Sequence, residues 1–415
     1  RNWGCKMGAD NVITNDQLTL DMESDPDNKP PETAPNEQFP NAALFESVQD
    51  QIAEWLVVDT DNDYLLDIIS ATCISVELER PLFMMIQGAS SSGKTKYLEL
   101  LNNMPNFHKL HCLTPKTLFS GHSDSDGGYI PAVMGKKGIL CIPDFTTVLS
   151  ECRSHRNEIF SQLRIAYDGE GGRATGVDVK NIQARQWRGK IACIFAVTQK
   201  IEHFKKNASD LGERFLYYRH NAKVIDEDEM LAWSTRDSKP KISKLRSEIN
   251  QLLKSSRRAL PQNIPDDDMC YIFTAAKFIA QMRAVVDRDN HSRQIELIHE
   301  PEQPFRLNEQ LTGLYKCLLA IHGRESTRPK AALTKVIGSC IPELRLQIIK
   351  LLHLQPSMRT AEIALNLNLP DTTIRTCLEE MNAQQVLTKV EGKQYNADVW
   401  SLNKHFTKLF KKVIR

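Results

Sequence analysis

Apolar residues recur at helical spacing in two stretches near the start of the chain, 44–58 and 64–78. Three short apolar runs follow, with the length and composition of buried strands: 82–87, 138–142 and 191–197. The intervals between these runs leave room for helices that cross over a sheet. This alternation predicts an α/β fold whose central sheet is parallel.

The chain beyond His220 is predicted to be mainly helical. The segment that opens at Arg306 carries one apolar stripe, formed by Leu307, Leu311, Leu314 and Leu318. Further on, three helical segments (343–353, 360–366 and 372–382) precede two short strands around Leu387 and Val399. We expect Asp371 to be the N-cap of the third helix. This order of elements is typical of a winged helix-turn-helix unit.

Composition adds the outer boundaries of the parts. Residues 21–40 are rich in proline and acid, which predicts an acidic linker or tail at 1–41. We expect the α/β core at 42–250, a helical lid region at 251–325 and the winged unit at 340–415. The formal charge of +1 gives no global attraction for nucleic acid. Scattered cysteines without a CxxC pair, and no apolar run long enough for a bilayer, favour a cytoplasmic protein with no membrane partner.

The most specific motif is the run GASSSGKT, which directly follows the first predicted strand. Glycines let successive backbone N–H groups turn inward around phosphates, and the lysine bridges the β- and γ-phosphates of ATP. The following threonine hydroxyl is a ligand for Mg²⁺. We therefore expect ATP and Mg²⁺ to bind at Gly88, Ala89, Ser90, Ser91, Ser92, Gly93, Lys94 and Thr95.

Two polar residues end the other predicted strands. Asp144 follows the second strand, where an acid faces the ligand cleft of an open α/β sheet, so it is the candidate for holding Mg²⁺ or ordering the attacking water. No second acid stands beside it, and Glu151 or Glu170 are alternatives for the catalytic base. Thr198 ends the third strand, either as a polar sensor of the γ-phosphate or as a strand cap.

Three arginines are candidates for stabilising charge on the transferred phosphoryl group. Arg214, in LGERF, is suited to reach the nucleotide of a neighbouring subunit, and Arg219 competes for that role. Arg306 opens a later helix and is a candidate for contacting the γ-phosphate of its own site. Each of them is alternatively an ordinary surface arginine.

With these residues in order, the chain from about 42 to 323 resembles the AAA+ ATPases. Within them it is similar to a group from phages and integrative elements that looks related to the minichromosome maintenance (MCM) helicases. The segments that carry the resemblance are SSGKT, DFTTVL, YDGEGGR, WRGKI, AVTQKI, LGERFLYYR and RLNEQLTGLYKCLLAIHG. One departure is that MCM proteins have Asp-Glu-Phe where this chain has Pro143-Asp144-Phe145, so Asp144 stands at the place of their catalytic glutamate.

The resemblance also implies a hairpin before the third strand, at 173–190. This run is basic and contains one tryptophan, a combination suited to tracking a nucleic-acid backbone. The candidate DNA contacts are Lys180, Arg185, Trp187, Arg188 and Lys190, and the alternative is a solvated basic hairpin.

These features support two hypotheses of different classes. The first is a hexameric, ATP-driven DNA translocase or helicase of a mobile genetic element, acting in DNA replication with single-stranded DNA in its channel. The second is a DNA-binding initiator or regulatory protein whose assembly is switched by nucleotide and whose hydrolysis is weak. The single acid at Asp144 favours the second. A protein-remodelling ATPase would leave the basic hairpin and the winged unit without a role.

Overall fold

The computed structural model describes residues 40–57, 63–119, 127–171, 187–205, 214–221, 223, 226–234, 242–289, 291–390 and 398–413. Residues Phe39–Arg415 form one compact unit. The predicted tail at 1–41 therefore lies outside the described residues except for its last two positions. Lys180 and Arg185 also lie outside them.

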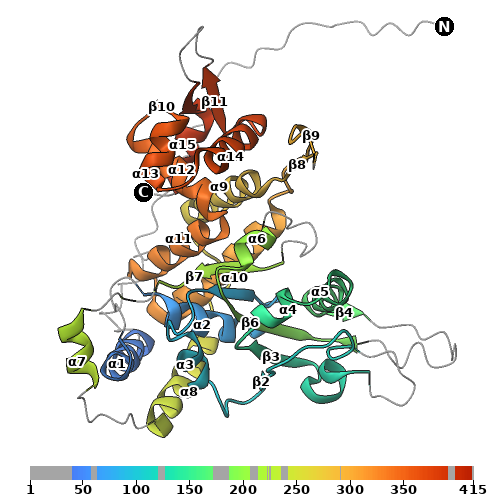
Figure 1. Cartoon of the computed structure of the whole chain (residues 1–415). Helices are drawn as coiled ribbons and strands as arrows, with labels where there is room; N and C mark the ends of the chain where they lie inside the picture. Colours follow the sequence, from blue (N-terminus) through green and yellow to red (C-terminus); the bar gives the residue numbers. More distant parts are fainter. Residues whose placement is uncertain are drawn as a thin grey trace, which may run out of the picture. The chain divides into compact units, whose positions relative to one another are not determined.

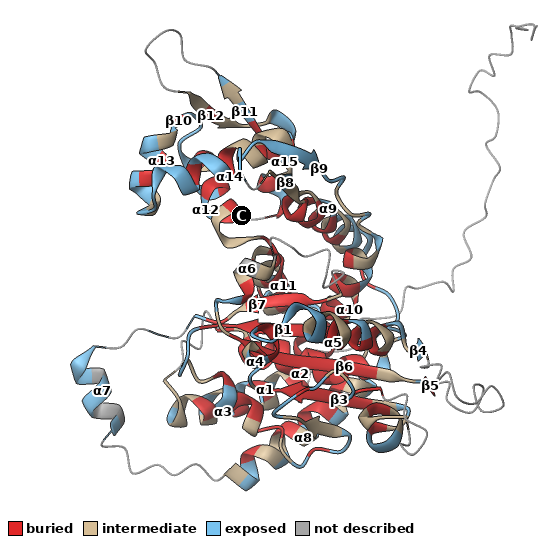
Figure 2. Ribbon diagram, turned by 45° about the vertical axis from the view of Figure 1, so that its right-hand side comes forward, coloured by how far each residue is buried: buried red, intermediate tan, exposed pale blue. Residues whose placement is uncertain are grey.

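A five-stranded parallel sheet forms the centre of the unit and confirms the predicted α/β class (Figure 1). Its spatial order is β2-β3-β6-β1-β7. The strands are β1 (Phe83–Gln87), β2 (Phe107–Lys109), β3 (Lys137–Ile142), β6 (Lys190–Val197) and β7 (Leu216–Arg219). The three predicted strands correspond to β1, β3 and β6, whereas β2 and β7 were not predicted. These three are buried along almost their whole length (Figure 2), as expected for a parallel sheet covered on both faces.

Successive side chains of each strand point to opposite faces of the sheet, and a different helix packs on each face. Phe83 and Phe195 point to one face, where Phe83 packs edge-on against Tyr167 of α5 (Arg153–Asp168) at 5.1 Å. Tyr218 points to the other face, where its hydroxyl donates to Asp63 at 2.9 Å, just before α2 (Leu65–Ile74). The sheet is thus enclosed by α5 on one side and α2 on the other.

Several of the other helices before residue 341 pack against one another. Helix α1 packs against α8, and α10 packs against α2, α9 and α11, while α11 covers β7 (Figure 1). A 3-10 turn (Ser75–Glu77) follows α2, a π-helical turn (Ile130–Met134) precedes β3, and small hairpins pair β4 with β5 and β8 with β9. The helices are α1 (Pro40–Trp55), α3 (Lys94–Glu99), α4 (Thr146–Leu149), α6 (Ile201–Lys205), α7 (Glu227–Ser234), α8 (Ile242–Arg258), α9 (Asp266–Arg283), α10 (Phe305–His322) and α11 (Arg328–Cys340); the hairpin strands are β4 (Glu170–Gly171), β5 (Trp187–Arg188), β8 (Val286–Arg288) and β9 (Ile295–Ile298). The predicted boundary at residue 250 falls inside α8.

The C-terminal part contains the three predicted helices and the two predicted strands. A third strand joins the sheet, in the order β10-β12-β11, and a final helix packs on α9. The elements are α12 (Glu343–Leu354), β10 (Met358–Arg359), α13 (Thr360–Leu367), α14 (Asp371–Ala383), β11 (Leu387–Val390), β12 (Val399–Leu402) and α15 (Lys404–Val413). The N-cap prediction was wrong: Pro370 occupies the cap position, and Asp371 is the first helical residue.

No helix within the described ranges is long and apolar enough to cross a membrane. The cysteines in these ranges are all free thiols, and Cys141 and Cys193 are buried in the central sheet.

Candidate functional site

The glycine-rich loop connects the end of β1 to α3, as the sequence predicts. Gly93 has φ of +86°, a left-handed conformation that residues with a side chain rarely adopt. A Cβ atom on Gly88 would lie 2.9 Å from the carbonyl oxygen of His220. The two glycines thus have separate roles, because one permits the turn and the other permits close approach to the chain beyond β7.

Lys94 is folded back into this loop. Its Nζ donates to the carbonyl oxygens of Gly88 at 3.0 Å and Ala89 at 2.5 Å, and to Ser92 Oγ at 3.0 Å. Burial lowers the pKa of the Lys94 ammonium, and the carboxylate of Asp144 partly opposes this shift. The loop therefore holds a buried cation among its own oxygens, and oxygens of an anionic ligand can replace them as acceptors.

Asp144 and Thr198 lie on loops that are pinned together at the carboxyl edge, the side of the sheet where the strands end at Gln87, Ile142, Val197 and Arg219. The Asp144 carboxylate is exposed, and its Oδ1 accepts from the Thr146 amide at 3.1 Å. The Thr198 amide donates to Thr146 Oγ1 at 3.1 Å. The chain thus brings Lys94, Asp144 and Thr198 to one edge, with the exposed Thr95 directly after Lys94.

Arg214 lies at the opposite, amino edge, where β7 begins. Its guanidinium pairs with Asp168 at 3.0 Å and lies 5.7 Å from the ring centroid of Tyr167. Arg306 is also at this edge, because its charge acts on Tyr167 and because Gln310, one turn further along α10, donates to the Arg214 carbonyl at 2.6 Å. A five-residue strand separates the two edges by about 17 Å. Neither arginine adjoins the glycine-rich loop of its own chain, which departs from the expectation that Arg306 serves its own site.

Arg219 has a structural environment instead. It lies at the carboxyl edge, where its guanidinium pairs with Glu202 at 3.0 Å and donates to the Gly338 carbonyl at 2.9 Å. A further bond goes to the Ile341 carbonyl, and the Arg219 amide donates to Ser339 Oγ. These contacts join β7 to the end of α11. The Arg219 guanidinium is therefore used by contacts within its own chain.

Of the residues predicted to contact DNA, one within the described ranges differs clearly from its prediction. Trp187 is 6% exposed, its Nε1 donates to the Gly135 carbonyl at 2.7 Å, and its ring packs edge-on against Phe119. The expectation that Trp187 offers a stacking surface was wrong, because the indole is part of the core. Lys190 donates to the Leu78 carbonyl at 2.8 Å, and Arg188 is exposed beside Glu170.

A buried histidine supports the glycine-rich loop from behind. His220 continues from β7, and its amide donates to the Gln87 carbonyl at 2.7 Å. Its ring Nε2 lies 2.7 Å from the Ser92 carbonyl oxygen, which can only accept, so Nε2 carries the proton. Its Nδ1 lies 3.3 Å from Asp63 Oδ1. The conformation of the loop is thus tied to a buried carboxylate.

The Asp63 carboxylate accepts three further hydrogen bonds. Oδ1 accepts from the Tyr218 hydroxyl at 2.9 Å and from the Leu65 amide at 3.0 Å, and Oδ2 accepts from the Tyr97 hydroxyl at 3.2 Å. The pKa values of the Tyr97 and Tyr218 phenols are raised well above the ordinary value, mainly by burial and secondly by the Asp63 carboxylate. Both hydroxyls therefore remain donors at neutral pH. These bonds join β7, α2 and α3 behind the loop.

The network continues to α11 through Arg328. Its Nη2 donates to the Asp63 carbonyl at 3.0 Å, and the guanidinium pairs with Asp67 through two 2.8 Å contacts. His322 Nε2 lies 2.7 Å from Asp67 Oδ1. A chain of buried polar contacts therefore connects the loop to the helix that leads to the C-terminal part.

A cleft of about 900 Å³ lies beside this network. Its lining includes Tyr64 and Asn221, the sequence neighbours of Asp63 and His220, together with residues of α11 and α12. That size lies within the range of pockets for small molecules.

Comparisons of the sequence with protein-family models and with curated proteins returned no match.

The sequence analysis missed Asp63, His220 and Arg328. Each stands among other polar residues, in the runs DTDND, RHN and RESTRPK, and nothing in the local pattern separates it from a solvated residue. One signal was available: the run LYYRH has the apolar and aromatic composition of a strand, and its His220 follows directly.

Proposed function

We propose that this chain binds ATP with Mg²⁺ at the loop from Gly88 to Thr95 and hydrolyses it. The observation that carries the proposal is the buried Lys94 ammonium, held by three loop oxygens at the carboxyl end of β1, an inner strand of the parallel sheet. In open α/β sheets, ligands bind at this edge, and lysine in such a loop contacts the transferred phosphate.

Thr95 and Asp144 suit the metal ion. Both side chains are exposed oxygen donors near Lys94, and Mg²⁺ prefers oxygen ligands of this kind. The ion, when bound, neutralises charge on the β- and γ-phosphates. Asp144, or Glu151 nearby on the chain, would accept the proton of the attacking water, and Thr198 would contact the γ-phosphate. The products are ADP and inorganic phosphate.

The strand order and the two arginines at the amino edge support an AAA+ arrangement with sites shared between subunits. Arg214 and Arg306 lie a strand length away from their own loop, so they complete a site only if a neighbouring copy brings its loop to them. A closed ring repeats this head-to-tail contact without leaving an unpaired end. We propose a homohexamer, as the family resemblance implies, in which both arginines act on the neighbour's nucleotide.

DNA is the proposed substrate of the motor. The support is the family resemblance, the C-terminal helices and strands in the order of a winged helix-turn-helix, and the exposed Arg188 at the base of the basic hairpin. In this proposal α14 contacts duplex DNA and the hairpin contacts single-stranded DNA, and ATP turnover drives translocation during replication of a mobile element.

The test is a pair of lysine variants. Lys94→Ala removes the ammonium group that is proposed to contact the transferred phosphate, so ATP hydrolysis should fall by orders of magnitude. Lys96→Ala is the matched control, because Lys96 is exposed on the same helix and pairs with Glu99. Phosphate release measured at saturating ATP should separate the two. Equal turnover in both variants would remove the loop as the active site.

A second candidate function is a nucleotide-switched DNA-binding initiator or regulator with weak hydrolysis. The specific observation in its favour is that Asp144 has no second acid beside it. ATPase activity with and without single-stranded DNA distinguishes the two, since a translocase should be stimulated and a switch should not.

A further inference from the structure

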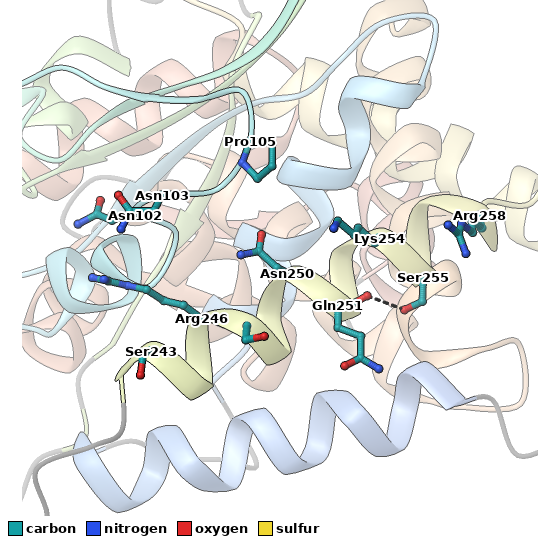
Figure 3. Close-up of a pocket in the computed structure, with 11 residues that line it drawn as sticks. Asn102, Asn103, Pro105, Ser243, Arg246, Asn250, Gln251, Lys254, Ser255 and Arg258 are labelled. Atoms are coloured by element: carbon teal, nitrogen blue, oxygen red, sulfur yellow. Dashed lines mark hydrogen bonds between the residues drawn. The ribbon is translucent and has the colours of Figure 1, made fainter.

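A polar groove follows one side of α8, at the end of α3 that lies away from Lys94. It is formed between α8 and the turn after α3, and has a volume of about 870 Å³ (Figure 3). From the turn, Asn102, Asn103 and Pro105 face the helix. This groove belongs neither to the glycine-rich loop nor to the basic hairpin.

The lining of the groove is positive and rich in donors. Three of its eleven residues, Arg246, Lys254 and Arg258, are cationic, and none is acidic. Most of the others carry an amide or a hydroxyl: Asn102, Asn103, Ser243, Ser247, Asn250, Gln251 and Ser255. Phosphate and sugar oxygens are contacted in proteins by this mixture of cations, amides and hydroxyls. For a chain with a formal charge of +1, the groove is a local excess of positive charge.

Arg246 is held in place on the wall of the groove. Its Nη2 donates to the Glu99 carbonyl at 3.0 Å, which fixes the guanidinium relative to the end of α3. Its Nε is buried and has no hydrogen-bond partner among the residues that the structure describes. A buried donor without an acceptor is costly, and this N–H group is not exposed to the groove, so Arg246 contributes to the groove a cation of fixed orientation.

The positive residues are spread along the groove instead of meeting at one point. Arg246, Lys254 and Arg258 follow one another along α8, with Asn250 between the first two (Figure 3). Twelve residues separate the two arginines, which is about 18 Å at the helical rise. That length is enough for a nucleic-acid backbone to present several phosphates. A single phosphate would need converging cations, whereas this row suits an extended polyanion.

We propose that this groove binds the sugar-phosphate backbone of DNA. The lining contains no aromatic side chain, so contact is made to the backbone and is independent of base sequence. The inference rests on the proposed action on DNA and adds a contact surface separate from the hairpin and the C-terminal part.

The test uses two double variants with the same change in charge. Lys254→Gln with Arg258→Gln removes two exposed cations of the groove. Lys244→Gln with Lys277→Gln removes two exposed lysines outside it and serves as the control. Binding of a fluorescein-labelled 30-nucleotide oligo-dT and of a labelled duplex is measured by anisotropy between 50 and 300 mM NaCl, and thermal unfolding verifies that all variants are folded.

The groove variant should bind single-stranded DNA roughly tenfold or more weakly at 50 mM salt, and its salt slope should fall by about 1.4, or about 0.7 for each lost contact. The control should keep the wild-type slope. If the wild type binds DNA but both double variants match it, the groove proposal is overturned and the proposed function stands. If the wild type binds neither probe, the proposed action on DNA fails and takes the groove with it. Displacement of DNA by 10 mM inorganic phosphate at constant ionic strength would overturn the proposal in favour of a small-anion site.

Discussion

The two edges of the central sheet differ in how deeply their polar contacts are buried. At the carboxyl edge, Lys94 is buried in its loop, and the loop is supported by the buried pair of His220 and Asp63. At the amino edge, Arg214 pairs with the half-exposed Asp168, and Arg188 pairs with Glu170 on the surface. The first edge is thus built from contacts inside the core, and the second from contacts that can be exchanged.

This difference fits the proposal that a second copy of the chain completes the site. The buried network fixes the glycine-rich loop through the contacts of His220 with Ser92 and Asp63. The Arg214 side chain is only 15% exposed, but its partner Asp168 is half-exposed and Arg188 is fully on the surface, so solvent reaches both ion pairs of this edge. In the proposed ring, each site combines the buried loop of one subunit with the amino-edge arginines of its neighbour.

The largest expected effect tests this division. Arg214→Ala should lower ATP turnover by about 10³- to 10⁵-fold, as removal of an arginine finger does. Mixing inactive Arg214→Ala subunits with inactive Lys94→Ala subunits should restore about one quarter of the sites at equal ratio, because each restored site needs one intact partner of each kind. Phosphate release across a series of mixing ratios gives the measurement.

Subunit exchange must be verified in the same samples, for example by energy transfer between labelled subunits. If exchange is complete and no ratio restores turnover, the two edges do not meet across a subunit boundary.

The next effect tests the buried half. Asp67→Asn should lower the free energy of unfolding by about 3–5 kcal/mol, because Arg328 loses its buried counter-ion. Asp287→Asn is the matched control, since Asp287 makes a similar contact with His299 on the surface. Urea unfolding at pH 7 should show a large loss for the first and almost none for the second. Equal losses would mean that the network adds no rigidity.

The pH dependence of the same residue follows from its pKa. Burial raises the pKa of Asp67. The hydrogen bonds from His322 and Arg328, together with their charges, lower it by more, so the net shift of the Asp67 pKa is downward. A carboxyl group whose pKa is lower in the folded state stabilises the protein above its unfolded pKa, and this contribution is lost as the pH falls below about 4. Asp67→Asn should therefore flatten the loss of stability between about pH 4 and pH 2.

The sequence was informative where chemistry and pattern coincide. The loop from Gly88 to Thr95 stands between a predicted strand and a helix, and the structure has that order. Local patterns do not give long-range partners. Trp187 looked like a stacking residue because its neighbours are basic, whereas its burial depends on Phe119 and Gly135, more than fifty residues earlier. Arg219 and Arg214 looked equivalent, and only the strand register separates them by edge.

A smaller effect is expected from the core tryptophan. Trp187→Phe keeps an aromatic ring but removes the hydrogen bond to the Gly135 carbonyl, so stability should fall by about 1–3 kcal/mol. Thermal unfolding and denaturant titration measure this loss. Because the indole is buried, the salt dependence of DNA binding should not change. A variant with full stability and weakened DNA binding would restore the stacking hypothesis.

The smallest expected effect concerns Arg188, whose side chain is 82% exposed. Its pairing with Glu170 should add little to stability, so Arg188→Gln should unfold at nearly the wild-type temperature. Its proposed role is to neutralise one phosphate, and loss of one contact lowers the salt slope for single-stranded DNA by about 0.7. Affinity at 50 mM salt should fall several-fold.

Lys137→Gln provides the control, because Lys137 is also at the amino edge and pairs with Glu77 on the surface. A change in slope for Arg188→Gln alone would assign DNA contact to the base of the hairpin. The same change in salt slope for both variants would mean that DNA binding depends only on the total charge of this edge. If neither slope changes while the wild type binds DNA, the contacts lie on other surfaces, and the exchangeable pairs at the amino edge serve the neighbouring subunit alone.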